Sequence, residues 1–233
     1  MKNIIIAGAG RGIGLKTAEL LNGQHRLFTI SRNETAELEV MNTKFYQIDI
    51  SKDDLNALND LPEVIDGLVF CPGSINLKPF NRLTAQDFLN DFNQNVLGAV
   101  ALIQKILPNL KKANGAGIVL FSTVAAKLGM PFHASVAASK AAIEGLAKSL
   151  AAEFAVSKIR VNVIAPSLTD TPLAAFLLNT DEKKEASGKR HPLQRIGTAE
   201  EIAQLVSFLL SDAASWITGQ IIGADGGMGS LKT

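Results

Sequence analysis

Residues 4–15 read Ile-Ile-Ile-Ala-Gly-Ala-Gly-Arg-Gly-Ile-Gly-Leu, the most informative segment of the chain for its fold. The three isoleucines predict a buried strand and the amphipathic run that continues to Leu21 predicts a helix, so the glycines form the tight turn between them. Such a turn leaves the first N–H groups of the helix unpaired at the positive end of its dipole, where a phosphate binds well. The opening stretch therefore predicts a strand, a phosphate-binding turn and a helix.

The spacing of the glycines separates this turn from other phosphate-binding motifs. The fingerprint G-x-G-x-x-G does not fit, because its third glycine would fall on Ile13 or Leu15, and no Lys-Ser/Thr pair follows as in a P-loop. The pattern that fits is G-x-x-x-G-x-G on Gly8, Gly12 and Gly14. Gly8 would let the chain reverse, and the other two would let a pyrophosphate and the strand approach the backbone. A glycine-rich turn that binds nothing remains the alternative.

Composition and charge give no sign of a polyanionic or membrane partner. The 233 residues suffice for one large α/β domain or two small ones; 47% are hydrophobic, 19% are charged and the net charge is +1. This balance gives no reason to expect nucleic acid, and no apolar run reaches the ~18 residues of a membrane span. The single cysteine, Cys71, excludes an internal disulfide and suits the cytoplasm, and the apolar stretch before the glycines is too short for a signal peptide.

Strand and helix patterns alternate along the rest of the chain. Further strands are expected at residues 27–30, 44–49, 67–70, 117–121, 159–164 and 219–224, and helices at 53–61, 84–112, 134–157 and 200–210. The alternation predicts a single α/β domain over residues 1–233, a Rossmann-like, doubly wound parallel sheet of about seven strands with helices on both faces. The polar segment 169–192 is expected to form a mobile lid or substrate loop.

The end of the second expected strand bears on the choice of nucleotide. In dinucleotide folds this point faces the adenosine ribose, where a carboxylate accepts from a 2′-hydroxyl and an arginine pairs with a 2′-phosphate. Ser31 and Arg32 stand there, and Arg11 adds positive charge from the glycine turn. These residues favour NADP(H) over NAD(H). An ordinary solvated role for Arg32 remains the alternative.

Other polar residues lie at strand ends or interrupt helix patterns. Asp49 lies at the end of the third expected strand, where it could accept from the adenine amino group; the alternative is a helix N-cap role, for which Ser51 is the other candidate. Asn95 lies in the middle of the long expected helix, where asparagine is a poor helix former, which suggests a buried hydrogen-bonding role. Thr123 ends an apolar strand, and Lys140 lies on an otherwise apolar helix.

Taken together, these segments resemble the short-chain dehydrogenase/reductase family, in the branch that includes the 3-oxoacyl carrier-protein reductases. The resemblance covers nearly the whole chain, in the family's order and spacing. Its signs are Gly8/Gly12/Gly14, Asp49-Ile50, Asn95-Val96-Leu97-Gly98, Ala138-Ser139-Lys140-Ala141-Ala142, residues 160–166, residues 191–198, Ile217-Thr218-Gly219-Gln220 and Asp225-Gly226-Gly227-Met228. It implies hydride transfer between a nicotinamide nucleotide and a carbonyl or alcohol.

The resemblance also implies roles for individual residues. Asn95, Thr123 and Lys140 fall on catalytic positions of the family, but the position of its tyrosine, four residues before the lysine, holds Val136. The single tyrosine of the chain, Tyr46, lies in the third expected strand. Valine cannot donate a proton, and general acid catalysis contributes typically ~10²–10⁴-fold. The resemblance therefore implies a weak enzyme or one with altered proton delivery.

The expected cofactor contacts, from the turn and from the resemblance, form a larger set. They are Gly8, Arg11, Gly12, Ile13, Gly14, Ser31, Arg32, Asp49, Ile50, Gly73, Lys140, Pro166 and Thr171. Lys140 is expected to hold the nicotinamide ribose, and no metal site is expected. His133, three residues before Val136, is a possible replacement acid, and its alternative is an ordinary loop residue at the start of the helix.

Two functions stay open at this point. The first is an NADP(H)-dependent oxidoreductase that acts on a small or acyl-chain carbonyl or alcohol with atypical proton delivery. The second is a catalytically inactive NADP(H)-binding protein that acts as a sensor or partner subunit. The intact glycine turn, Thr123 and Lys140 favour the first, whereas Val136 favours the second. In either case the resemblance implies a homo-oligomer, a tetramer or a dimer.

Overall fold

The computed structural model describes residues 1–232, which form one seven-stranded parallel sheet in the order β3-β2-β1-β4-β5-β6-β9. Its strands are β1 (Asn3–Ala7), β2 (Arg26–Ser31), β3 (Thr43–Gln47), β4 (Gly67–Phe70), β5 (Gly117–Phe121), β6 (Arg160–Pro166) and β9 (Ile221–Ala224). From β3 at one edge the chain returns to β4 beside β1, so the strand order reverses between β1 and β4. The doubly wound α/β fold expected from the alternation is confirmed.

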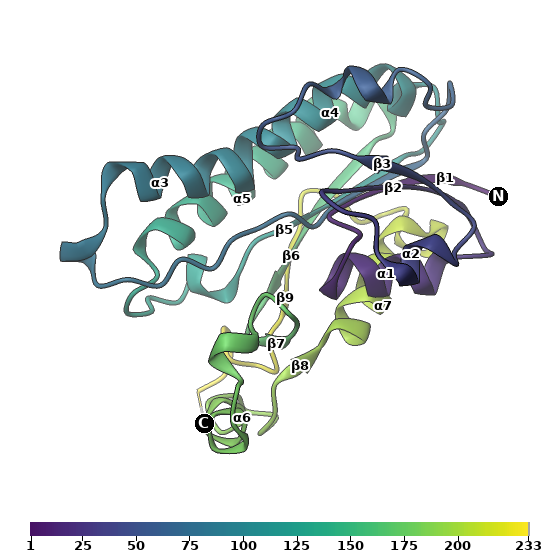
Figure 1. Cartoon of the computed structure of the whole chain (residues 1–233). Helices are drawn as coiled ribbons and strands as arrows, with labels where there is room; N and C mark the ends of the chain where they lie inside the picture. Colours follow the sequence, from purple (N-terminus) through teal and green to yellow (C-terminus); the bar gives the residue numbers. More distant parts are fainter. Residues whose placement is uncertain (233) are drawn as a thin grey trace.

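Helices cover both faces of this sheet (Figure 1). On one side lie α4 (Gly98–Lys111) and α5 (Ala134–Phe154); on the other lie α1 (Gly12–Leu21), α2 (Ala36–Glu39) and α7 (Ala199–Leu210). Successive strand side chains point to opposite faces, so Ile5 joins the core beneath α4 and α5, whereas Ile4 and Ile6 join the core beneath α1 and α7. Burial on both faces explains why these strands are continuous apolar runs.

The amino end of α1 lies against the end of β1 at very short range. A Cβ added to Gly14 would stand 2.2 Å from the carbonyl oxygen of Gly8, so only glycine allows this approach. Gly8 and Gly12 have φ values of +78° and +57°, which side-chain-bearing residues rarely adopt. The glycine turn therefore fixes where the first helix starts relative to the sheet.

The long helix expected at 84–112 contains a wider turn in its middle. Helix α3 (Ala85–Phe92) is followed by a π-helical turn, η3 (Asn93–Leu97), before α4 begins. Asn95 is buried within η3, at 1% exposure. Wider turns of this kind are frequent at functional sites, and this one turns an asparagine into the interior between α3 and α5.

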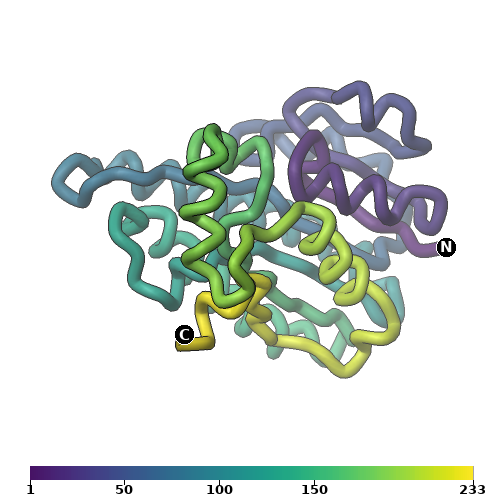
Figure 2. Tube along the Cα trace, turned by 90° about the horizontal axis from the view of Figure 1, so that it is seen from below, coloured from purple at the N-terminus to yellow at the C-terminus, as the bar shows by residue number. Residues whose placement is uncertain are grey.

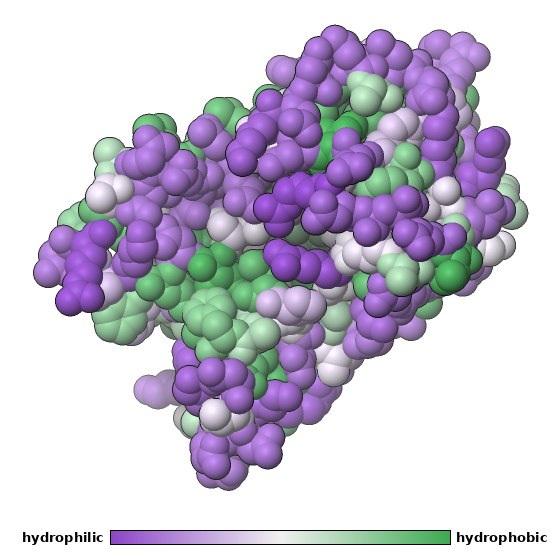
Figure 3. Space-filling model, viewed as in Figure 1, coloured by the Kyte–Doolittle hydropathy of each residue, from purple (hydrophilic) through white to green (hydrophobic). Residues whose placement is uncertain are grey.

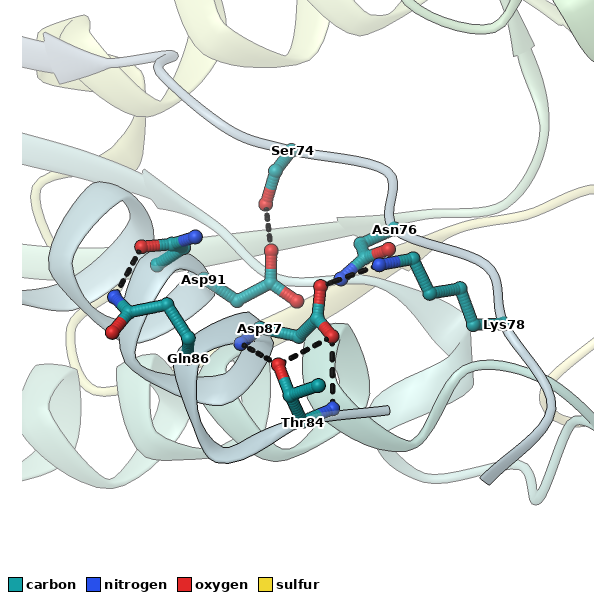
Figure 4. A network of polar contacts seen from close by, with 8 residues as sticks. Ser74, Asn76, Lys78, Thr84, Gln86, Asp87 and Asp91 are labelled. Carbon is teal, nitrogen blue, oxygen red and sulfur yellow. Dashed lines mark hydrogen bonds and ion pairs between the residues drawn. The ribbon is translucent and has the colours of Figure 1, made fainter. Parts of the chain in front are cut away.

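A network of polar contacts ties the loop after β4 to the start of α3 (Figure 4). Thr84 Oγ1 accepts a hydrogen bond from Asp87 N at 3.2 Å, and the carboxylate of Asp87 accepts one from Thr84 N at 2.9 Å, a capping box. Asp87 also accepts from Lys78 Nζ at 2.6 Å and from Asn76 Nδ2 at 3.2 Å. The ion pair with Lys78, followed by the hydrogen bonds from Thr84, holds the pKa of Asp87 well below its usual range.

The segment expected to be a substrate loop is more ordered than its sequence indicates. It contains the short strand β7 (Thr169–Asp170), which pairs with β8 (Gly197–Thr198), the turn η6 (Ala175–Leu177) and helix α6 (Asp181–Gly188). Just beyond it, Leu193 N donates to Gly226 O at 3.2 Å. Figure 2 shows the C-terminal tail in yellow at the foot of this green segment. Its mobility stays a prediction.

Smaller elements also differ from expectation. Residues 53–61 form only the 3₁₀ turn η1 (Leu55–Leu58), and Asp54 caps it by accepting from Asn56 N at 3.0 Å. Asp54 is therefore the cap of η1, whereas Asp49 accepts from Ser51 N at 3.1 Å in the turn before it. Among the helices of residues 1–232, none combines the length and the hydrophobicity that a membrane span requires.

The contact between Gly14 and Gly8 predicts a sharp difference between two glycine substitutions. We expect Gly14→Ala to lower the free energy of unfolding by about 1–3 kcal/mol or more, because the new methyl group meets a backbone oxygen. Gly145→Ala, in α5, should raise it by ~0.5–1 kcal/mol, since the added methyl meets no atom within 4 Å. Urea denaturation followed by circular dichroism measures both, and equal effects would contradict the packing described.

Candidate functional site

Two cavities adjoin at the carboxyl edge of the sheet, where the strand order reverses. The first, of about 410 Å³, lies between the start of α1 and the ends of β1 and β2. The second, of about 310 Å³, lies beyond the ends of β5 and β6. Five residues line both and so form their shared wall: Ile13, Cys71, Gly73, Thr171 and Leu173. Doubly wound folds bind their ligands at this point of the sheet.

The first cavity collects most of the residues expected to contact a nucleotide. Its lining includes Gly8, Arg11, Gly12, Ile13, Gly14, Ser31, Arg32, Asp49, Ile50, Gly73 and Thr171. The remaining two, Lys140 and Pro166, line the second cavity. The expected set therefore lies around two adjoining hollows and is not scattered over the molecule.

The amino end of α1 is built to receive a negative group. No described side chain caps this helix, and its first turn holds no acidic residue. Its first residues, Gly12, Ile13 and Gly14, line the first cavity. The helix dipole therefore presents its positive end there, and the glycines leave the backbone open to a ligand. These residues fit the diphosphate of a dinucleotide.

The end of β2 has hydroxyl and guanidinium groups in place of a carboxylate. The hydroxyl of Ser31 donates to Asn33 O, and the next residue, Arg32, is exposed at the cavity lining. Across the cavity, Asp49 Oδ1 accepts from Ser51 Oγ at 2.6 Å and Ser51 N at 3.1 Å. The hydrogen bond from the Ser51 hydroxyl is the main cause that lowers the pKa of Asp49, and the charge of Arg32 contributes.

The second cavity has mostly apolar walls. They include Ile75, Leu77, Met130, Leu173 and Leu177. Figure 3 shows apolar surface, in green, in the hollow between the arm that carries α3 and the segment that carries α6. Cavities of this kind bind the apolar body of a small molecule and orient it through a few polar groups.

Lys140 is the buried cation of this second cavity. Its side chain comes from α5, and Nζ donates to Phe121 O at 3.0 Å. Desolvation lowers the pKa of Lys140 to about 8, against the opposing effects of Cys71 and Asp91. Burial raises the pKa of the Cys71 thiol to about 12, so this thiol is neutral where the lysine titrates. Asp91 is therefore the charge that opposes the desolvation of Lys140.

A layer of buried polar side chains lies behind this cavity, between α3 and α5. Asn95 Nδ2 donates to Ser139 Oγ at 2.8 Å and to Ser74 Oγ at 3.4 Å. Ser74 donates in turn to Asp91 Oδ1 at 2.6 Å (Figure 4). Within the part of the chain that the structure describes, Asn95 Oδ1, Asp91 Oδ2 and Ser135 Oγ are buried without a hydrogen-bond partner. Of these, sequence reasoning identified Asn95 and missed Asp91, although the two are one helical turn apart.

The other residues considered for proton donation have distinct surroundings. Thr123 lines the second cavity, and its Oγ1 accepts from Ala125 N at 3.3 Å. His133 lines it too, with Nδ1 2.7 Å from Pro131 O. Val136 is 5% exposed in the same wall. Tyr46 lies in edge strand β3, and its hydroxyl donates to Asp60 Oδ1 at 2.7 Å.

A second pair of polar residues in this cavity went unpredicted. Ser167 follows β6 and His191 follows α6, and their side chains lie 2.8 Å apart at Oγ and Nε2. Both line the second cavity. The sequence offers no periodic signal for this contact, because the two residues lie in irregular segments and meet only in the folded chain.

Comparison with known proteins agrees with this fold and this edge of the sheet. The profile of the family described as enoyl-(acyl carrier protein) reductase matches residues 8–229. The chain belongs to the short-chain dehydrogenase/reductase family. This short-chain dehydrogenase/reductase is 34% identical to a tropinone reductase homologue of Arabidopsis thaliana, over 97% of this chain and 92% of that protein.

Two further proteins are similar over nearly their whole length. The 3-oxoacyl-[acyl-carrier-protein] reductase of Thermotoga maritima is 33% identical, over 97% of both chains. The solved structure of ElxO with NADP bound superposes with a TM-score of 0.87 at 27% identity, over 99% of both chains. The chain is therefore an oxidoreductase of this family.

The buried ammonium of Lys140 predicts a gain in stability when it is removed. We expect Lys140→Met to raise the free energy of unfolding of the cofactor-free protein by about 1–3 kcal/mol at pH 7, less than the lowered pKa alone would give, because Asp91 loses an opposite charge. The folded pKa of about 8 lies below the ordinary 10.5, so below pH 8 the lysine is charged in both the folded and the unfolded state, and the cost of burying its charge is fully present. This penalty, and with it the gain from Met, declines as the pH rises from 8 through 10.5.

Urea denaturation at pH 7 and pH 10 measures this effect. Lys148→Met is the matched control, because Lys148 is an exposed lysine on the same helix, and we expect it to change neither value. A loss of stability in Lys140→Met at pH 7 would show that the ammonium is net stabilising, against the argument from desolvation.

Proposed function

We propose that this short-chain dehydrogenase/reductase is an NADP(H)-dependent enzyme that interconverts a carbonyl and an alcohol. The observation that carries the proposal is the adjoining pair of cavities, with the uncapped amino end of α1 in the first and the Lys140 ammonium and Thr123 hydroxyl in the second. The nicotinamide nucleotide supplies or accepts the hydride. The NADP bound in ElxO and the reductase names of the two relatives support this assignment.

The preference for NADP(H) is argued from charge at the end of β2. Arg32 and Arg11 line the first cavity, and Ser31 stands where a carboxylate would repel a 2′-phosphate. On the opposite side, Thr171 lies where the two cavities meet. The second cavity is lined by Pro166 and Lys140. In this proposal they hold the nicotinamide end, and Lys140 binds the ribose hydroxyls.

Proton transfer in the proposed reaction differs from that of the family because Val136 stands four residues before Lys140. Thr123 donates a hydrogen bond to the substrate oxygen from one wall of the cavity. With a pKa of about 8, the ammonium of Lys140 carries a proton at pH 7 and delivers it through water. Asn95 positions this wall from behind through Ser139 and Ser74. We expect a slow enzyme, since the missing acid contributes typically ~10²–10⁴-fold.

Val136 also supports a second candidate function, that of an NADP(H)-binding sensor or partner subunit without turnover. Both functions use the same first cavity and differ only in the second.

The proposal extends to a small or acyl-chain substrate, a homo-oligomeric assembly and a cytoplasmic location, the last supported by the single cysteine.

The nucleotide preference is tested by one substitution at the end of β2. Arg32→Ala should raise the Kd for NADPH by about 10-fold or more, through loss of a charge-assisted hydrogen bond, and leave that for NADH unchanged. Arg26→Ala is the matched control, because this exposed arginine starts the same strand at its opposite end. Fluorescence titration of the wild type and of both variants with each nucleotide measures the six dissociation constants. Equal weakening of NADPH and NADH binding by Arg32→Ala would count against 2′-phosphate recognition.

The altered proton delivery is tested by restoring a phenol. Val136→Tyr should raise kcat for reduction of small ketones by ~10²-fold or more, because it adds a general acid beside Lys140. Val136→Phe adds the same ring without the hydroxyl and should give no gain. Steady-state NADPH oxidation measures both. If the two variants behave alike and the wild type shows no turnover, the binding function without catalysis is favoured.

A further inference from the structure

The pair of Ser167 and His191 has a fixed direction of hydrogen bonding. His191 Nδ1 lies 2.9 Å from Ser187 O, and its Nε2 lies 2.8 Å from Ser167 Oγ. A carbonyl oxygen only accepts, so Nδ1 must carry the proton. Both partners of this buried ring are uncharged oxygen atoms, and in the neutral tautomer that the Ser187 carbonyl selects, Nε2 accepts from the serine hydroxyl. The proton of Ser167 is thus directed at the imidazole.

This arrangement decides what Ser167 can offer to a molecule in the second cavity. With its proton held by His191, the oxygen of Ser167 has only lone pairs left for a ligand, so it acts as an acceptor. Ser167 is partly exposed in the cavity wall, whereas His191 is 3% exposed behind it. A hydroxyl of the ligand would satisfy this oxygen, whereas a carbonyl or carboxylate placed there would face it lone pair to lone pair.

The position of Ser167 relates this acceptor to the reacting carbonyl. Thr123 follows β5 and Ser167 follows β6, and these strands are neighbours in register, with Phe121 opposite Ile164. Neighbouring strands lie about 4.8 Å apart. Side chains just beyond their ends can therefore contact two atoms of one ligand that are separated by a few bonds. The donor Thr123 and the acceptor Ser167 both line this one cavity of mostly apolar walls, each just beyond the end of one of two neighbouring strands.

We propose that Ser167, oriented by His191, is a specificity-determining residue that selects substrates with a hydroxyl next to the reacting carbonyl. This proposal rests on the proposed function. The chemical class is an α-hydroxyketone with short apolar ends, reduced to the vicinal diol, in preference to the corresponding diketone or 2-oxo acid. Its competitor in the same cavity is Arg190, an exposed cation of the lining that would attract a carboxylate instead.

Three ligands of nearly the same size separate these possibilities: 4-hydroxy-3-hexanone, 3,4-hexanedione and 2-oxohexanoate. Isothermal titration calorimetry of the protein at pH 8 should give a Kd for the hydroxyketone about 10-fold below that for the diketone. Calorimetry measures binding and needs no turnover. If the protein proves inactive, the proposed oxidoreductase activity is overturned, but the preference among the three ligands can still be measured. Equal binding of hydroxyketone and diketone would overturn the proposal. Tighter binding of 2-oxohexanoate than of either would overturn it too and assign recognition to Arg190.

Substitution of the histidine tests the orientation of the hydroxyl. His191→Phe frees the Ser167 proton to be donated, so we expect the preference for the hydroxyketone to fall about 10-fold, toward parity. His25→Phe is the matched control, because His25 lies just before β2, at the end of that strand away from both cavities. It should keep the wild-type ratio. Should His191→Phe fail to fold, Ser167→Val gives the same expected loss of preference by removing the oxygen itself. An unchanged ratio in whichever of these two variants folds would overturn the assignment.

Discussion

The backbone of Gly14 approaches the carbonyl oxygen of Gly8 so closely that no side chain fits between them, and this approach sets the position of helix α1 on the sheet. It brings the start of α1 directly against the end of β1, beside the point where the strand order reverses. Two consequences follow from the same contact. The free N–H groups of the helix face the first cavity, and α1 lies close enough to the sheet to pack against α7 on the same face. Any side chain at position 14 would therefore disturb both the packing of α1 on the sheet and the shape of the first cavity.

The parts of the fold that the sequence predicts are those set by local patterns. The isoleucines of β1 and the apolar run of β5 are buried on both faces, so their residue types alone indicate strands. Helix α6 could not be found in this way. Its sequence is polar and Gly188 is its only buried residue, so no apolar period marks it. The π-helical turn at Asn95 is visible in the sequence only as an asparagine in a poor position for a helix.

The candidate site likewise contains residues that local sequence patterns predict and residues that come together only in the folded chain. The glycine turn and Arg32 belong to one strand–turn–helix unit and the strand next to it, so their spacing in the sequence carries over into space. The pair of Ser167 and His191 is 24 residues apart and depends on how the segment with α6 folds back over the end of β6. Asp91 could be seen one helical turn before Asn95, but its burial depends on the packing of α3 against α5.

The two charged side chains buried near the second cavity, Lys140 and Asp91, partly offset the cost of each other's burial. A lysine at 7% exposure and an aspartate at 2% exposure are each costly alone, since burial penalises the charged form. The negative charge of Asp91 raises the pKa of Lys140 against desolvation, and Ser74 supplies Asp91 with a hydrogen bond. Because Asp91 approaches from α3 and Lys140 from α5, the aspartate can support the ammonium without occupying the cavity. The space in front of Lys140 is thereby left to a ligand, which is the requirement for a cation that binds or protonates one.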